Sequence, residues 1–225
     1  MRFKKDSPSP IAYLLPNFFT AASIFTGFFS IAVALEQQYM AAAWFVFLAL
    51  IFDGLDGRVA RLTNTASHFG VEFDSLADIV AFGVAPALLM YLYVGHDYGR
   101  IGIGVSGIFI IFGAVRLARF NVTTSRIEPS VFIGLPIPTA AIMIAIAILL
   151  LESYPQYHVL KIILLPFALI LAVLMVSNIR YPSFKKMNFK SFHFLRMLII
   201  IIFISFGIFV YPIEGMSLLA LAYLA

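Results

Sequence analysis

Four aspartates within residues 53–78 have the types and spacing that could carry chemistry. Asp53 and Asp56 are three positions apart, and Asp74 and Asp78 are four positions apart, so each pair shares one face of a helix. Carboxylates packed together in a low-dielectric site repel one another unless cations neutralise them. All-oxygen ligands favour hard ions such as Mg²⁺ or Mn²⁺. We therefore expect a site for two divalent cations, which would suit phosphoryl chemistry.

Small residues and arginines accompany these aspartates. Gly57, Ala60 and Gly70 leave room for a ligand or a facing helix to approach closely. Arg61 lies one turn beyond Gly57 and has the charge and geometry to bind a diphosphate. The alternative is that the aspartates form buried salt bridges with Arg58 and Arg61, but four acids and two arginines do not balance.

The composition indicates a membrane protein. Of 225 residues, 62% are hydrophobic and 12% are charged, whereas a soluble domain has about 25% charged residues. The polar surface would not cover a soluble globule of this size, and a disordered chain would be poor in apolar residues. The absence of cysteine excludes disulfides, a thiol nucleophile and thiolate metal sites. We predict an integral membrane protein.

The apolar stretches are long enough to cross a bilayer, which takes about 20 residues of helix. The predicted spans are residues 14–35, 40–61, 72–94, 102–119, 135–151, 158–178 and 194–212. An eighth span at 214–225 is possible but short. The first stretch is too long for a secretory signal, so we expect a retained helix.

Basic residues at alternating span ends predict the orientation. Two lie on one side, Arg100 and Lys161, and thirteen on the other. The thirteen are Arg2, Lys4, Lys5, Arg58, Arg61, Arg116, Arg119, Arg126, Arg180, Lys185, Lys186, Lys190 and Arg196. This bias places the N-terminus and the aspartates on the cytoplasmic side of the plasma (inner) membrane. It also argues against a nucleic-acid partner, because the basic residues sit at helix ends and form no stripe.

The pattern D-x-x-D-G-x-x-A-R-x8-G-x-x-x-D-x-x-x-D is met at every fixed position from Asp53 to Asp78. It resembles the signature of the CDP-alcohol phosphotransferases. This resemblance implies an all-α, polytopic membrane helix bundle with a six-helix core, commonly dimeric, plus one or two C-terminal helices. Such enzymes move a substituted phosphate from a CDP-alcohol to an acceptor hydroxyl and release CMP. We expect an N-terminal segment at 1–13, a catalytic core at 14–180, and a basic loop with C-terminal helices at 181–225.

Segments around this signature are similar to the phosphatidylserine synthases of that family. These segments are Pro16–Thr20, Glu72–Asp78, Phe82–Ala87, Arg116–Asn121 and Phe132–Pro138. The resemblance implies CDP-diacylglycerol and L-serine as substrates and phosphatidylserine and CMP as products. Within the family, synthases of phosphatidylglycerol phosphate or phosphatidylinositol phosphate remain alternatives. A cation transporter is a remote one, because its acids should be scattered near the midplane.

The resemblance also implies roles for the aspartates. Asp53, Asp56, Asp74 and Asp78 would hold two Mg²⁺ or Mn²⁺ ions, with Asp78 as a shared ligand and the general base. The nucleotide and its diphosphate are expected to contact Asn17, Thr20, Asp56, Gly57, Ala60, Arg61, Gly70 and Ser75.

Serine is a zwitterion, so its site needs a cation for the carboxylate and acceptors for the ammonium group. Arg116 and Arg119 end the fourth predicted span on the side of the aspartates, and Arg126 follows in the loop. One or two of these arginines could pair with the serine carboxylate, with Asn121 as a further polar partner. The alternative role of all three arginines is anchoring to lipid headgroups.

Overall fold

Six helical units make up the described part of the chain, which is residues 10–123, 131–182, 213–215 and 217–218 of a computed structural model. The unbroken helices are α1 (Pro10–Leu35), α2 (Tyr39–Leu62), α5 (Arg100–Thr123) and α6 (Ile137–Ser153). The third unit joins α3 (His68–Asp78), the π-helical segment η1 (Ile79–Val84) and α4 (Ala85–Tyr93). The last joins the 3₁₀ segment η3 (Pro155–Ile163) to α7 (Leu164–Val176). A short 3₁₀ turn, η2 (Gly95–Tyr98), precedes α5.

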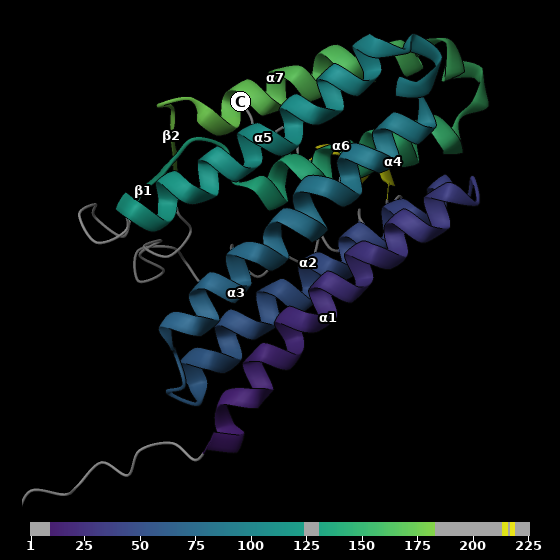
Figure 1. The fold of residues 1–225 in the computed structure, drawn as a ribbon. Helices are drawn as coiled ribbons and strands as arrows, with labels where there is room; N and C mark the ends of the chain where they lie inside the picture. Colours follow the sequence, from purple (N-terminus) through teal and green to yellow (C-terminus); the bar gives the residue numbers. More distant parts are fainter. Residues whose placement is uncertain (1–9, 124–130, 183–212, 216, 219–225) are drawn as a thin grey trace, which may run out of the picture.

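Five of these units are long and apolar enough to cross a membrane, and α6 is a shorter apolar helix. The expected helical membrane bundle with a six-helix core is thus confirmed, and the chain is an integral membrane protein. The predicted span 194–212 lies outside the described residues, as does 214–225 apart from a few positions. In Figure 1, α1 and α2 run side by side, and α5 lies along α7; both pairs are in extensive contact.

Two details of the fold differ from expectation. The third span begins at His68 and not at residue 72, because the Ser67 side chain accepts a hydrogen bond from Gly70 N at 3.0 Å and caps the helix there. A short antiparallel pair of strands, β1 (Val131–Ile133) and β2 (Arg180–Pro182), also joins the segments before α6 and after α7. Three-residue strands leave no recognisable periodicity in a sequence.

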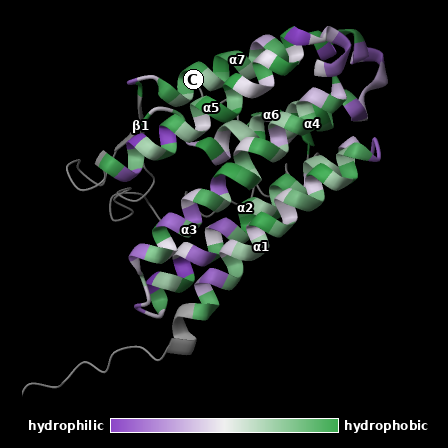
Figure 2. Cartoon of the chain, in the orientation of Figure 1, coloured by the Kyte–Doolittle hydropathy of each residue, from purple (hydrophilic) through white to green (hydrophobic). Residues whose placement is uncertain are grey.

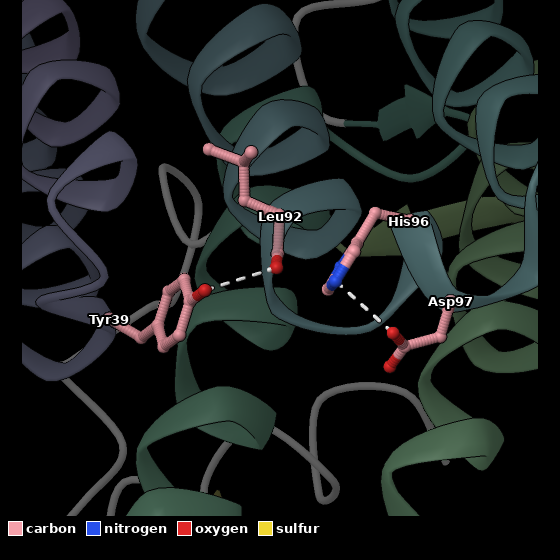
Figure 3. Close-up of polar contacts among 4 residues, drawn as sticks. All are labelled: Tyr39, Leu92, His96 and Asp97. Carbon is pink, nitrogen blue, oxygen red and sulfur yellow. Dashed lines mark hydrogen bonds and ion pairs between the residues drawn. The ribbon is translucent and has the colours of Figure 1, made fainter.

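Several polar contacts lie at the end of the bundle where α1 leads into α2. The Tyr39 hydroxyl donates to the Leu92 carbonyl oxygen at 3.1 Å, and His96 Nε2 lies 3.1 Å from Asp97 Oδ1 (Figure 3). Lys161 Nζ lies 4.2 Å from the centre of the Tyr93 ring. The four aspartates lie toward the other end of α2, where Figure 2 shows hydrophilic residues gathered on α2 and α3.

The first and third units approach each other closely at Gly27. A Cβ atom at this position would lie 2.8 Å from the Cα atom of Ala81 in η1, so the backbones are in direct contact. This contact holds α1 against the helix that carries Asp74 and Asp78.

We expect Gly27→Leu to lower the free energy of unfolding by about 1–3 kcal/mol or more, the usual cost of overpacking. The measurement is thermal unfolding of the detergent-solubilised protein. Gly104→Leu is the matched control, because a Cβ atom there meets no atom within 4 Å. Equal melting temperatures for the two variants would contradict the close contact.

Candidate active site

A five-residue turn, residues 63–67, brings α2 and α3 together. Thr65 is buried, and its Oγ1 lies 2.7 Å from Thr63 Oγ1. Asn64 adopts a positive φ of 54°, a conformation that asparagine tolerates better than most residues. The turn reverses the chain so that the faces carrying the two aspartate pairs meet.

Three of the aspartates form one cluster. Asp53, Asp56 and Asp74 each offer a carboxylate oxygen, and these oxygens all lie within 4.8 Å of one another. Asp78 adjoins the cluster, because its carboxyl group interacts directly with that of Asp53. Asp78 is 8% exposed, and its Oδ1 is buried without a hydrogen-bond partner in the described part of the chain.

These carboxylates fit divalent cations. Within the described residues, neither Arg58 nor Arg61 forms an ion pair with any of the four aspartates, and both side chains are exposed. The alternative of buried salt bridges is therefore not realised. Clustered carboxylates are costly in a poorly solvated site unless cations neutralise them, and the buried Asp78 Oδ1 has no hydrogen-bond partner in the described part of the chain. An all-oxygen donor set of this kind matches Mg²⁺ or Mn²⁺.

A cavity of about 200 Å³ opens beside the cluster, between α1, α2 and α3. The Thr20 hydroxyl on α1 donates to Asp56 Oδ2 at 2.7 Å and links the cavity wall to the cluster. A Cβ atom added at Gly57 would meet no atom within 4 Å. The space at Gly57 is therefore open to a ligand and is not filled by a facing helix.

The structure gathers most of the predicted nucleotide residues in this cavity. Its lining includes Asn17, Thr20, Asp56, Gly57, Ala60, Arg61 and Gly70, together with Asp74. Ser75 does not line it; the Ser75 hydroxyl donates to the Val71 carbonyl oxygen on its own helix. The cavity is also lined by five residues that the sequence did not predict for it: Pro16, Thr65, Ala66, Ser67 and Val71. Only Ser67 carried a signal, since serine before an apolar helix is a common N-cap.

The predicted acceptor residues on α5 have different surroundings. Arg116 is 6% exposed, lies 5.4 Å from the Phe120 ring centre, and its charge acts on Asp78. Asn121 Nδ2 donates to Ser75 Oγ at 3.0 Å, which ties α5 to α3. Both residues thus face the aspartate helix.

Arg119 is engaged elsewhere. Its guanidinium group donates to the carbonyl oxygens of Val176, Ser177 and Ile133, each at 3.1 Å. These are backbone groups at the end of α7 and in β1. Arg126 lies outside the described residues.

Comparisons with known proteins identify the family of this chain. Residues 13–176 match the model of the CDP-alcohol phosphatidyltransferase family. The chain therefore belongs to the CDP-alcohol phosphatidyltransferase family, which makes it a membrane enzyme of phospholipid biosynthesis. Divalent-metal dependence is general in this family.

Several relatives are named CDP-diacylglycerol–serine O-phosphatidyltransferase, among them the following three. The protein of Helicobacter pylori is 53% identical over 94% of this chain and 88% of the relative. That of Methanocaldococcus jannaschii is 37% identical over 76% of this chain and 74% of the relative. That of Bacillus subtilis is 34% identical over 76% of this chain and 92% of the relative.

Proposed function

We propose that this chain transfers the phosphatidyl group of CDP-diacylglycerol to the hydroxyl group of L-serine, giving phosphatidylserine and CMP. One observation carries the chemistry: three carboxylate oxygens within 4.8 Å of one another beside a cavity large enough for part of a nucleotide. The relatives' names, which specify CDP-diacylglycerol and serine, support the choice of substrates.

The nucleotide half of the substrate would occupy the cavity between α1, α2 and α3. The glycine at 57 leaves space for it, and the exposed guanidinium group of Arg61 would bind the diphosphate. The acyl chains would remain in the bilayer. The basic residues at the span ends favour an orientation with the N-terminus and the site facing the cytoplasm. We expect the membrane to be the plasma (inner) membrane. We further expect a homodimer, as the family resemblance implies.

The four aspartates have two proposed roles, metal binding and general-base catalysis. Asp53, Asp56, Asp74 and Asp78 would hold two Mg²⁺ or Mn²⁺ ions, which when bound would neutralise charge on the diphosphate. Asp78 is the proposed general base: its buried Oδ1 lacks a partner and is available to accept the serine hydroxyl proton. The serine oxygen would then attack the lipid-side phosphorus in line with the departing CMP.

The acceptor would bind between α3 and α5. Arg116 is buried and its charge acts on Asp78, so a serine carboxylate paired with this arginine would have its hydroxyl close to the base. Asn121 supplies a further polar group near the same place.

The test is a comparison of acceptors. Purified protein with CDP-diacylglycerol and Mn²⁺ is given L-serine, glycerol 3-phosphate or inositol phosphate, and CMP release is measured. We expect release with L-serine. Release with either phosphorylated acceptor but not with L-serine would overturn the choice of acceptor and leave the family assignment intact.

A substitution at Gly57 tests the nucleotide cavity. We expect Gly57→Leu to raise the KM for CDP-diacylglycerol at least about tenfold, the effect of losing roughly 1.4 kcal/mol of binding, because its side chain would enter the cavity. Gly54→Leu is the matched control one turn earlier on α2, where an added Cβ is also unobstructed but the residue does not line the cavity. The measurement is steady-state kinetics on both variants. Equal KM values for CDP-diacylglycerol would contradict the assignment of this cavity to the nucleotide.

A further inference from the structure

Arg119 joins three segments that are far apart in the sequence. Besides its bonds to Ile133, Val176 and Ser177, its guanidinium group lies within hydrogen-bond distance of the Met175 carbonyl oxygen and of Asn178 Oδ1, each at 3.4 Å. The last carbonyl groups of a helix lack partners within the helix. A guanidinium group carries five donors in a fixed fork, so Arg119 satisfies the end of α7 in a way that a single-point donor could not.

Backbone contacts around Arg119 complete this connection. Gly134 N donates to the Ile179 carbonyl oxygen at 2.8 Å, and Leu135 N donates to the Leu174 carbonyl oxygen at 3.0 Å. Together with the pairing of β1 and β2, they bind the segment before α6 to the segment after α7. We call Arg119, residues 133–135 and residues 174–179 the Arg119 clasp.

Gly134 is required by the geometry of the clasp. Its φ is +78°, a conformation that side chains of L-residues rarely adopt. A Cβ atom here would lie 2.2 Å from the Met175 carbonyl oxygen and 2.8 Å from Arg119 Nη2. Even alanine at this position would therefore push apart the groups that Arg119 holds together.

The same end of α5 carries the proposed acceptor residues. Arg116 is three positions before Arg119, and Asn121 is two positions after it. Both act on α3, through Asp78 and through Ser75. Helix α5 packs chiefly along α7. The clasp at the end of α7 therefore holds the C-terminal end of α5 in position.

We infer that Arg119 is a positioning residue, which holds Arg116 and Asn121 against the aspartate helix and does not itself bind the acceptor. This inference rests on the proposed function. It replaces the expectation that Arg119 pairs with the serine carboxylate, because its fork is directed at backbone carbonyl groups of the clasp.

The experiment breaks the clasp in two independent ways. Arg119→Lys keeps the positive charge but removes the fork, and Gly134→Ala displaces the clasp while leaving Arg119 in place. We expect each variant to raise the KM for L-serine about tenfold, since a misplacement of about 1 Å costs up to roughly a hundredfold. The KM for CDP-diacylglycerol should stay within about twofold of wild type, and the double variant should resemble either single variant and not their sum.

Gly104→Ala is the matched control on α5, where an added Cβ meets no atom within 4 Å. If Gly134→Ala is not recovered folded, Asn178→Ala takes its place with a smaller expected rise. A rise in serine KM for Arg119→Lys alone would show that Arg119 contacts the acceptor directly and would overturn the inference. Equal effects on both substrates would overturn it too, because they would indicate general destabilisation.

The wild-type assay separates this inference from the proposed function. No serine-dependent CMP release by the wild type would refute the proposed function. An active wild type with an unchanged serine KM in both clasp variants would refute the role of Arg119 alone.

Discussion

Asp78→Asn is expected to lower CMP release about a thousandfold, within the range of roughly 10²–10⁴ that a positioned general base contributes. The amide has the shape of the carboxylate but cannot accept the serine proton. Asp78 is buried beside Asp53, and its Oδ1 has no hydrogen-bond partner among the described residues. Asp78 does not line the cavity, and the cluster of Asp53, Asp56 and Asp74 remains to hold the ions, so the variant should still bind the nucleotide. Steady-state CMP release and equilibrium CDP-diacylglycerol binding are the two measurements.

Asp97→Asn is the control for this substitution. It makes the same chemical change in an exposed residue at the other end of the bundle, where Asp97 lies beside its neighbour His96 (Figure 3). The control should keep wild-type turnover. Near-normal CMP release by Asp78→Asn with L-serine would refute Asp78 as the base.

Asp56→Asn is expected to raise the Mn²⁺ concentration needed for half-maximal activity at least about a hundredfold, more than loss of an outer-shell partner of a metal ligand costs. The amide oxygen can still accept the bond that Thr20 donates to Asp56 Oδ2 at 2.7 Å. The main loss is therefore one negative charge from the three-carboxylate cluster. The measurement is CMP release as a function of Mn²⁺ concentration.

Glu72→Gln tests whether net charge alone produces that effect. Glu72 is on the same helix as Asp74, is exposed and does not line the cavity. Its removal should leave the Mn²⁺ requirement unchanged. If both variants shift the requirement equally, the effect comes from the surface potential, and Asp56 is not a metal ligand.

Much of the fold could be predicted because the thickness of a bilayer sets the length of each apolar segment that crosses it. The predicted first span, 14–35, coincides with the observed candidate span Leu14–Leu35, and 40–61 differs from Tyr39–Leu62 by one residue at each end. The aspartate cluster could also be predicted from the geometry of helices. Helical spacing within each pair and a short turn between them leave few ways to arrange the carboxylates other than face to face.

The remaining features depend on contacts between segments that are distant in the sequence. Arg116 and Arg119 look equivalent in sequence, three residues apart at the end of one helix, yet one is buried near Asp78 and the other holds the end of α7. Arg119 donates to backbone carbonyl groups, which every residue has, so the sequence could not predict these partners. The sequence also did not predict the π-helical segment η1 after Asp78. This segment contains Ala81, whose backbone lies in direct contact with Gly27 of α1.

The most direct test of the central claim is the stoichiometry of products from the wild-type protein. CDP-diacylglycerol and Mn²⁺ are supplied with and without L-serine, and CMP and phosphatidylserine are both quantified. A transfer from the nucleotide to the serine hydroxyl gives equal amounts of the two products and negligible CMP without serine. CMP release at the same rate without serine, or CMP without matching phosphatidylserine, would contradict the claim.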